Sequence, residues 1–445
     1  MAERHEVAVV GAGLAGLSAA WHLRDRDVVV LEAEERVGGR IRSEPRGRYW
    51  LNWGAHVFGG PGSEVGRLAA ALGLDAVPAP GVLTALELGG RVYAGGRVET
   101  LPLRVPLSAR ERVSLLRAGL RLRLAVRAYD RVVRPRAGEP EASRQARTLA
   151  FLADRSFADF LGPVPPVVES LFRPTITRSS AEPGQLSAGH GVGYFHLVWR
   201  PGEGLSRNIA GGSSLLTTGL AAGLPQVLTG VRAVEVEALP DRVVVRHEGG
   251  ELEAAHAIVA TPAHAAAGLL RGVSPETLDA LGRIPYGPYV VVSLLTAEAG
   301  PQPWDAIYAL ATPGRAFNMV FNLANVLRPG APREPGGSLM LYSGGERLAR
   351  PLLERADDEI VDAYLADLDA AFPGSHRLVS EALVQRWPRA LPYPFPGRQL
   401  LQPALTRPLG RVHLAGDYLG SFYTETAART GREAAAAVRA ALERE

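Results

Sequence analysis

Three features of the sequence predict an α/β fold. The first is an apolar segment, Val7 to Val10, that runs into a glycine-rich segment, and the second is another apolar segment at Val28 to Leu31. The third is the return of apolar, strand-like segments far along the chain, at 257–262 and 412–415. Helical patterns separate these segments, and strands that alternate with helices are typical of α/β proteins.

The glycine-rich segment, Gly11-Ala12-Gly13-Leu14-Ala15-Gly16, lies between the first strand and a helix expected over 17–24. The N-terminus of such a helix presents free N–H groups and the positive end of its dipole to a pyrophosphate. Gly11 permits a tight turn, Gly13 lets the backbone approach the phosphates, and Gly16 allows the helix to pack closely on the strand. The segment therefore predicts a dinucleotide-binding turn that includes Leu14 and Ala15.

The second strand ends at Glu32-Ala33, about twenty residues beyond Gly11. A carboxylate at this point can accept hydrogen bonds from both ribose hydroxyls of an adenine nucleotide, and it would repel a 2′-phosphate. Gly38-Gly39-Arg40 follows. The glycine pair brings a second backbone segment close to the dinucleotide, and the arginine can neutralise pyrophosphate charge.

With these motifs the chain resembles the FAD-dependent amine oxidase superfamily, which includes flavin-containing amine oxidases, protoporphyrinogen oxidases and phytoene desaturase-like enzymes. The resemblance implies a Rossmann-like domain in which FAD is held by Gly11, Gly13, Gly16, Glu32 and Arg40. It also implies that Gly54 and Ala55 lie against the isoalloxazine ring and that the backbone of Val231 pairs with the adenine.

The C-terminal segment supplies a further part of the expected FAD site. Its strand ends in Gly416-Asp417, where the glycine lets the cofactor pass closely and the aspartate can bind the ribityl chain or a pyrophosphate-bound water. An alanine-rich helix then begins at Thr424-Glu425-Thr426-Ala427, where the family commonly has Met-Glu-Gly-Ala. Its N-terminus, aimed at N1/O2 of the flavin, would stabilise the negative charge of the reduced ring.

Two residues are candidates for catalysis. His56 follows Gly54-Ala55 and could contact the flavin or the substrate, or it could be a histidine that packs in a loop. Tyr423 could supply one aromatic wall beside the flavin, but the sequence shows no convincing second wall.

The order of these segments predicts a discontinuous domain organisation. Residues 1–60, 205–265 and 391–445 form the expected FAD-binding domain, and residues 61–204 are expected to be mainly helical and to face the substrate or a membrane. Residues 266–390 form an expected α+β substrate-binding domain with a helix at 357–371. Its strands are expected at 289–295, 316–322, 338–342 and 378–385, with one buried face that would line a ligand cavity.

The composition excludes several kinds of chemistry. The combined count of lysine and arginine is 49, all of them arginine, and the chain contains no cysteine. No lysine base, thiolate ligand or cysteinyl flavin link can therefore form, so the FAD is expected to be noncovalent and no metal site is predicted. The formal charge of +3 over 445 residues does not support nucleic-acid binding. Without a signal segment or an apolar run long enough to span a bilayer, the protein is expected in the cytoplasm.

One segment, 107–136, is rich in leucine and arginine. Such a helix could lie on an anionic membrane as a peripheral contact, which would suit an enzyme that draws an apolar substrate from lipid. The alternative is a solvated helix face whose arginine stems cover the edge of the core. The arginines of segment 107–136 are Arg110, Arg112, Arg117, Arg121, Arg123, Arg127, Arg131, Arg134 and Arg136.

The oligomeric state of the protein is left open.

The sequence favours an FAD-dependent oxidoreductase that removes a hydride from a C–H bond of a mainly apolar small molecule. Amine oxidases of this fold usually place a lysine near flavin N5, which this chain cannot supply. The short interval from Asp417 to Gly431 is more similar to protoporphyrinogen oxidase-like and desaturase-like members, which can work largely by orienting the substrate. Two alternatives stay open: an amine or amino-acid oxidase without the usual lysine, and a non-redox FAD-dependent isomerase.

Overall fold

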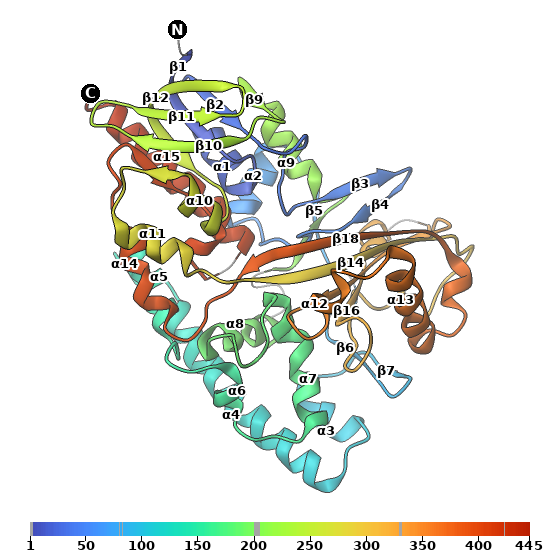
Figure 1. The fold of residues 1–445 in the computed structure, drawn as a ribbon. Helices are drawn as coiled ribbons and strands as arrows, with labels where there is room; N and C mark the ends of the chain where they lie inside the picture. The colour runs from blue at the N-terminus through green and yellow to red at the C-terminus, as the bar shows by residue number, and fades with distance from the viewer. Residues whose placement is uncertain (1–2, 80, 82, 200–204, 329–331, 422) are drawn as a thin grey trace.

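Two large sheets and a helical region make up the fold (Figure 1). The computed structural model describes residues 3–79, 81, 83–199, 205–328, 332–421 and 423–445, and the side chains of Val198 and Tyr423 lie outside this description. In Figure 1 the first sheet lies at the upper left, the second sheet at the right, and the helical region below them.

The first sheet has the order β13-β10-β11-β12-β1-β2-β9, with β19 paired to β12. Strands β12, β1, β2 and β9 pair in parallel. Val7 and Val9 on one face and Ala8 and Val29 on the other are fully buried, as expected when both faces of a parallel sheet are covered. The strands are β1 (Glu3–Val10), β2 (Val28–Leu31), β9 (Gln226–Leu228), β10 (Ala233–Ala238), β11 (Val243–His247), β12 (Gly250–Val259), β13 (Leu270–Arg271) and β19 (Val412–Leu414).

Helix α1 (Leu14–His22) follows β1 directly, and the C-terminal helix α15 (Tyr423–Leu442) packs along it. The two helices approach closely at Gly431, where a Cβ would lie 2.2 Å from the Ala15 carbonyl oxygen. This contact brings the last segment of the chain to the first glycine turn. The other helices of this part are α9 (Ser214–Ala222), α10 (Ala263–Leu269), α11 (Pro275–Gly282) and α14 (Gln402–Leu405).

The second sheet has the order β18-β14-β17-β16-β15-β6-β7. Along β14, Val290, Val292 and Leu294 pack against helix α13 (Asp357–Ala371), whereas Val291 and its neighbours on the other face pack toward the first part of the chain. The alternation follows from the two-residue period of a strand. The strands are β6 (Ala85–Leu88), β7 (Arg91–Tyr93), β14 (Tyr286–Thr296), β15 (Ala309–Ala311), β16 (Met319–Asn322), β17 (Gly337–Gly344) and β18 (Val379–Pro392).

The helical region is built around α4 (Ala109–Val133), which begins with a capping box between Ser108 and Glu111. Its buried side packs on α8 and α5. The other helices of this region are α3 (Leu101–Arg104), α5 (Glu141–Ala150), α6 (Phe157–Leu161), α7 (Pro166–Ile176) and α8 (Ala188–Trp199). Smaller elements are α2 (Glu64–Ala71), α12 (Ala349–Leu352) and the pairs β3 (Ser43–Arg46) with β4 (Tyr49–Asn52) and β5 (Ala76–Pro78) with β8 (Arg207–Ile209).

The structure confirms the predicted α/β fold and differs from the sequence pattern at several elements. For example, β15 was not predicted, and β18 runs to Pro392 rather than to 385. α1 begins at Leu14 rather than Leu17, because the glycine turn itself forms the first helical residues. β12 begins at Gly250, where alternating exposed and buried residues conceal a long strand. β6 and β7, from the stretch expected to be mainly helical, join the second sheet.

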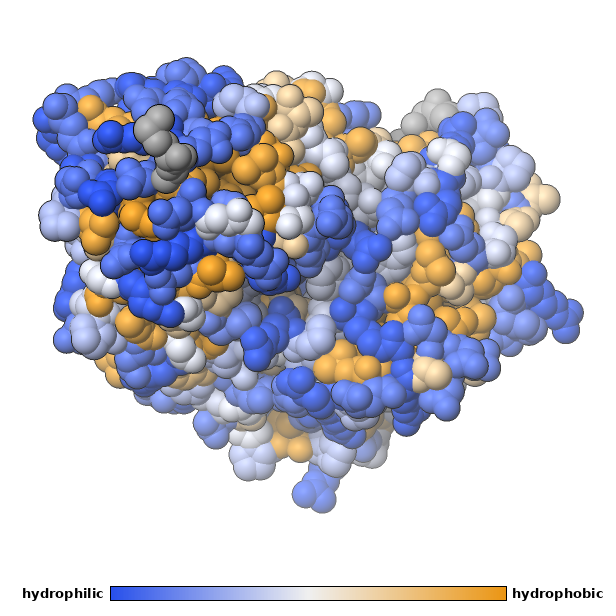
Figure 2. Space-filling view, turned by 45° about the horizontal axis from the view of Figure 1, so that its top comes forward, coloured by the Kyte–Doolittle hydropathy of each residue, from blue (hydrophilic) through white to orange (hydrophobic). Residues whose placement is uncertain are grey.

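The surface drawn in Figure 2 is mostly hydrophilic, with small hydrophobic patches between polar residues. Among the described residues, none of the helices combines the length and hydropathy needed to cross a bilayer.

Candidate functional site

A cavity of about 750 Å³ lies between the two sheets and the helical region, and residues from all three line it. All residues predicted to hold the cofactor line this cavity except Gly16, so segments far apart in the sequence meet at one place. They are Gly11, Gly13, Leu14, Ala15, Glu32, Ala33, Gly38, Gly39, Arg40, Gly54, Ala55, His56, Val231, Gly416, Asp417, Thr424, Glu425 and Ala427.

The three glycines of the first turn differ in their surroundings. Gly11 has a φ of 102°, which residues with a side chain rarely adopt. A Cβ at Gly16 would lie 1.9 Å from the Gly11 carbonyl oxygen, so Gly16 packs behind the cavity wall. Gly13 has an ordinary φ of −71°, and no atom lies within 4 Å of the position of its missing Cβ. A side chain at Gly13 would therefore enter the cavity itself.

Glu32 is fixed at the end of β2 by backbone donors. Its two carboxylate oxygens accept hydrogen bonds from the N–H of Ala12 at 2.7 Å and from the N–H of Glu34 at 2.9 Å. In this orientation the carboxylate can also accept ribose hydroxyls. Val231 lies at the same end, where its N–H donates to the Glu32 carbonyl oxygen at 2.8 Å. The Val231 carbonyl oxygen is then the backbone group that an adenine can use.

Arg40 and Asp417 form an ion pair of 2.7 Å across the cavity wall, and Arg40 also donates to the Ala390 carbonyl oxygen at 2.9 Å. Burial pulls the pKa of Arg40 down, but Asp417 outweighs burial and the pKa lies above its ordinary value. Asp417 Oδ1, Thr261 Oγ1 and His264 Nδ1 are buried atoms of the cavity lining that have no hydrogen-bond partner among the residues that the structure describes. Buried polar atoms are seldom left unpaired, so this part of the wall fits the polar ribityl and pyrophosphate groups of FAD.

The other part of the cavity is walled by aromatic rings. Tyr289 and Tyr342 have ring centroids 5.1 Å apart, Tyr342 and Phe321 are 5.9 Å apart and nearly parallel, and Phe321 meets His56 edge-on at 4.6 Å. We call these four residues the aromatic row. Tyr289, Tyr342 and Phe321 come together because β14, β17 and β16 are neighbours in the second sheet and present the same face, and His56 reaches this face from the loop after β4. The row begins beside Gly54 and Ala55, where the flavin ring is expected.

His56 is a neutral member of this row. Its Nδ1 lies 3.3 Å from the Gly54 carbonyl oxygen, and its Nε2 has no hydrogen-bond partner in the described part of the chain. Burial lowers the pKa of His56 from 6.5 to about 4, so the imidazole is uncharged at neutral pH and is a weak base. Nε2 can accept a hydrogen bond from a ligand.

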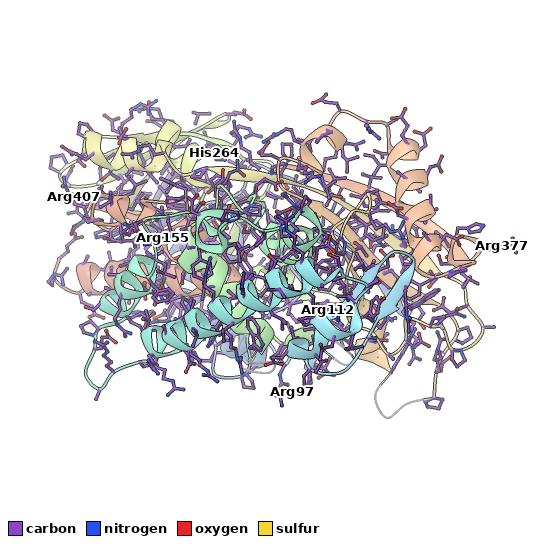
Figure 3. The ribbon with its side chains drawn as sticks, turned by 90° about the horizontal axis from the view of Figure 1, so that it is seen from below. Arg97, Arg112, Arg155, His264, Arg377 and Arg407 are labelled. Atoms are coloured by element: carbon purple, nitrogen blue, oxygen red, sulfur yellow. The ribbon has the colours of Figure 1, made fainter. Side chains whose placement is uncertain are left out.

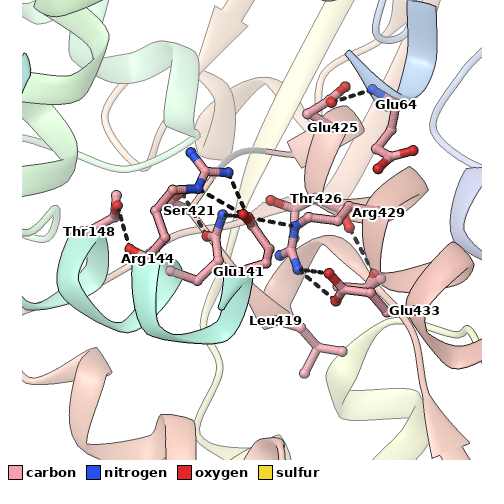
Figure 4. A network of polar contacts seen from close by, with 12 residues as sticks. Glu64, Glu141, Arg144, Thr148, Leu419, Ser421, Glu425, Thr426, Arg429 and Glu433 are labelled. Carbon is pink, nitrogen blue, oxygen red and sulfur yellow. Dashed lines mark hydrogen bonds and ion pairs between the residues drawn. The ribbon is translucent and has the colours of Figure 1, made fainter. Parts of the chain in front are cut away.

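Glu425 has a structural task. Its carboxylate accepts the N–H groups of Glu64 and Val65 at the N-terminus of α2, as Figure 4 shows for Glu64. The same figure shows a neighbouring network of ion pairs, among them Arg429 with Glu433. The side-chain charge of Glu425 therefore caps α2, and Thr424 and Ala427 are the other residues of this segment on the cavity wall. The side chain of Tyr423, predicted to form an aromatic wall, lies outside the described residues.

Several lining residues were not found by sequence reasoning. Tyr194, Arg178 and Trp387 come from three separate elements, and no local motif marks any of them. Tyr289 and Tyr342 lie in expected strands, but only the sheet order shows that their rings meet. Within the described ranges, no cluster of three or more His, Asp or Glu side chains could hold a metal ion.

Comparison with known proteins agrees with this geometry. The family model for flavin containing amine oxidoreductase matches residues 14–439. Coproporphyrinogen III oxidase of Mycobacterium bovis is 25% identical over 438 residues, which cover 92% of this chain and 92% of that protein. Protoporphyrinogen oxidase 2 of Arabidopsis thaliana is 46% identical, but over 70 residues that cover 15% of this chain. Three curated relatives with such short matches are covered over only 8%, 14% and 23% of their own lengths.

Solved structures show the same fold. A redesigned putrescine oxidase superposes with a TM-score of 0.80 at 17% identity, over 98% of this chain and 99% of that one. Cyclohexylamine oxidase from Brevibacterium oxydans gives a TM-score of 0.78 at 20% identity, over 99% of both chains. The family match extends over nearly the whole length, from the glycine turn to the last helix. The chain belongs to the flavin-containing amine oxidoreductase family and is an FAD-dependent oxidoreductase.

Proposed function

We propose that the enzyme removes a hydride from a C–H bond of a mainly apolar small molecule, with bound FAD as the acceptor, and that the neighbouring atom then loses a proton to the solvent, which leaves a double bond. The observation that carries this proposal is the aromatic row, which continues the cavity from the expected flavin position and offers apolar surface to a ligand. Trp53, Met340 and Trp387 add to the same lining. Pockets of this kind bind apolar ligands and orient them with a few polar groups.

The residues of the chain have mainly positioning tasks in this reaction. Bound FAD supplies the hydride acceptor. Burial raises the pKa of Tyr289 and Tyr342 well above 10, so both phenols stay neutral, and their rings exclude water from the substrate carbon. His56 Nε2 can accept a hydrogen bond beside the reacting carbon, but with a pKa of about 4 it is not a strong base. Orientation of the C–H bond is then the main contribution of the protein.

The names of two structural neighbours, putrescine oxidase and cyclohexylamine oxidase, make an amine the first alternative. Two features of this chain count against it. No lysine exists to take the usual place near the flavin, and the charged side chain beside the aromatic row is an arginine, Arg178. A protonated amine placed near a guanidinium is repelled rather than bound. The second alternative, an isomerase, differs in consuming no electron acceptor.

Anaerobic mixing tests the proposal. The holoenzyme is mixed with a polyene, with coproporphyrinogen III, with putrescine and with cyclohexylamine, and the flavin absorbance is followed. The proposal expects bleaching by one of the first two compounds and none by the amines. Bleaching by the amines alone would overturn it, as would a product formed without any flavin reduction or acceptor consumption.

We also propose that the outer side of α4 lies on an anionic membrane. The buried side of α4 carries Leu115, Leu122 and Val126, whereas Leu120 and Leu124 on the opposite side are 63% and 55% exposed. Val113 and Leu116 are exposed on the same side, with exposed arginines between them. α4 crosses the near side of the molecule in Figure 3, where Arg112 is labelled. Exposed leucines between arginines suit the boundary between acyl chains and anionic headgroups.

Flotation with vesicles tests this contact. The holoenzyme should float with vesicles that contain phosphatidylserine and should stay unbound with phosphatidylcholine alone, because each arginine near an anionic surface contributes about 1 kcal/mol. Leu120→Glu with Leu124→Glu should abolish flotation, whereas Leu215→Glu, an exposed leucine of α9, should not. Equal flotation of the double variant would contradict the proposal. So would a dimer of the free protein that depends on Leu120 and Leu124.

A further inference from the structure

Arg178 stands out in the cavity because the turn that carries it is rigidly held. The turn follows α7 and contains Ser180, which is fully buried with a φ of 61°, a conformation that residues with a side chain rarely adopt. Ser180 donates its hydroxyl to the Leu391 carbonyl oxygen at 3.0 Å. The Tyr289 hydroxyl donates to the backbone carbonyl oxygens of Arg178 and Thr177. Strained residues that surrounding contacts hold in place tend to cluster at functional sites.

The second sheet leaves no room for this turn to move. A Cβ on Gly287 would lie 1.8 Å from the Ser180 carbonyl oxygen, and a Cβ on Gly344 would lie 2.5 Å from the Thr177 carbonyl oxygen. The backbone of the turn thus rests directly on β14 and β17. Arg178 is thereby placed at a fixed position relative to the aromatic row.

The guanidinium of Arg178 lies in the cavity. It lies over the ring of Tyr194, 5.8 Å from its centroid. Burial is the main reason that the pKa of His56 is low, and the charge of Arg178 lowers it further. The same charge acts on Tyr342, whose pKa burial raises. Arg178 therefore lies beside the aromatic row, and Tyr289 of that row donates its hydroxyl to the Arg178 carbonyl oxygen.

Within the described part of the chain, Arg178 forms no ion pair with a carboxylate. The acidic residues of the cavity lining are already engaged: Glu32 by backbone N–H groups, Glu34 by Arg36, Asp417 by Arg40, and Glu425 by α2. A partly buried charge without a counter-ion is unfavourable unless a ligand supplies one.

The other arginines of the lining serve the dinucleotide end. Arg40 is paired with Asp417, and Arg232 is 3.7 Å from Glu248. Burial lowers the pKa of His264, and the charges of Arg389 and Arg40 lower it further, so both arginines act on a residue of the dinucleotide end. Arg178 is thus the arginine of the substrate end.

We infer that Arg178 binds a carboxylate group of the substrate and so fixes which C–H bond lies beside Gly54, Ala55 and His56. A guanidinium offers two parallel N–H donors that match the two oxygens of a carboxylate. A carboxylate fits better than a phosphate dianion, because the one guanidinium supplies a single positive charge and the neighbouring phenols are neutral. The inference rests on the proposed function and names the substrate class as a mainly apolar molecule that carries a carboxylate.

Ligand binding without turnover tests this inference. 4-Phenylbutyrate, its neutral amide, 4-phenylbutylamine and phenyl phosphate are titrated into the holoenzyme, and each dissociation constant is measured by calorimetry and by the shift of the flavin spectrum. The acid should bind about 10- to 100-fold more tightly than the amide, as expected for a charge-assisted hydrogen-bonded pair, and the amine should bind least. Equal binding of acid and amide in the wild type would overturn the inference. So would tighter binding of the amine or of phenyl phosphate.

Three variants refine the test. Arg178→Gln should reduce acid binding to the level of the amide while retaining FAD, and Arg178→Lys should give an intermediate value because the paired donors are lost and the charge is kept. Arg110→Gln, at an exposed arginine of α4, should leave the preference unchanged. Retention of the preference in Arg178→Gln would refute the inference. If Arg178→Gln does not fold, the wild-type ratios and Arg178→Lys still decide. Because no turnover is needed, a failure of the substrate panel to bleach the flavin would refute the proposed function alone.

Discussion

Replacing Gly13 by valine should separate FAD binding from folding. Gly13 has a φ of −71° and a ψ of 175°, a conformation that valine adopts without strain, and the missing Cβ meets no atom within 4 Å. Valine is a poorer helix N-cap than glycine, at a cost of up to about 1 kcal/mol. The reduced freedom of the unfolded chain offsets about 0.4–1 kcal/mol of that cost. The free energy of unfolding of the apoprotein should therefore change by no more than about 1 kcal/mol.

Gly16→Ala gives the matched contrast. Its Cβ would lie 1.9 Å from the Gly11 carbonyl oxygen, so α1 must move away from the turn. Overpacking of this kind costs about 3 kcal/mol or more, and the apoprotein itself should be destabilised.

Urea unfolding of the apoproteins, with and without added FAD, measures both effects. FAD at 100 times its dissociation constant should stabilise the wild type by about 2.7 kcal/mol and should leave Gly13→Val unchanged. Two results would show that Gly13→Val does not separate FAD binding from folding. One is a Gly13→Val protein that is purified with a full complement of FAD, and the other is an apoprotein of that variant several kcal/mol less stable than the wild type.

Heat or acid should release all of the flavin into the supernatant, because the chain has no cysteine that could bind the flavin covalently. Flavin that stays on the denatured chain would instead indicate a covalent histidine link, for example at His56. Asp417→Asn should lower the free energy of unfolding of the apoprotein by about 2 kcal/mol, because it leaves the Arg40 guanidinium without its carboxylate partner. An unchanged free energy of unfolding, measured in urea, would contradict a stabilising ion pair. The pKa of His56 is about 4 when folded against 6.5 when unfolded, so unfolding takes up a proton between these values and wild-type stability falls as the pH is lowered through them. In His56→Phe the free energy of unfolding should fall by about 3 kcal/mol less than in the wild type between pH 7 and pH 4, as measured by urea unfolding at both pH values. The same pH dependence in the variant and the wild type would show that His56 is not buried as a neutral ring.

Much of the fold and the cofactor could be predicted from local sequence. Gly11, Gly13 and Glu32 lie in one short segment where each backbone or side-chain requirement is set by its neighbours. Gly416-Asp417 ends a strand whose apolar residues mark it clearly. Patterns of this kind are readable because the physical cause and the residues that show it are adjacent in the chain.

The substrate end could not be predicted, because long-range contacts create it. Phe321 and Tyr342 meet Tyr289 only through the order of the strands in the second sheet. Arg178 had no local signal in a chain with 49 basic residues, and its importance follows from the turn that the sheet holds in place. The contacts of Glu425 were hidden for the same reason, since the motif at 424–427 does not show that the Glu425 carboxylate accepts N–H groups at the N-terminus of α2.

Anaerobic reduction of the flavin in a single turnover tests the proposed hydride transfer from an apolar substrate. An apolar molecule with an oxidisable C–H bond should bleach the flavin band and yield one equivalent of a product with a new double bond. Cyclohexylamine and putrescine should leave the band unchanged. Rapid bleaching by either amine, with the apolar compounds inert, would show that the enzyme is an amine oxidase instead.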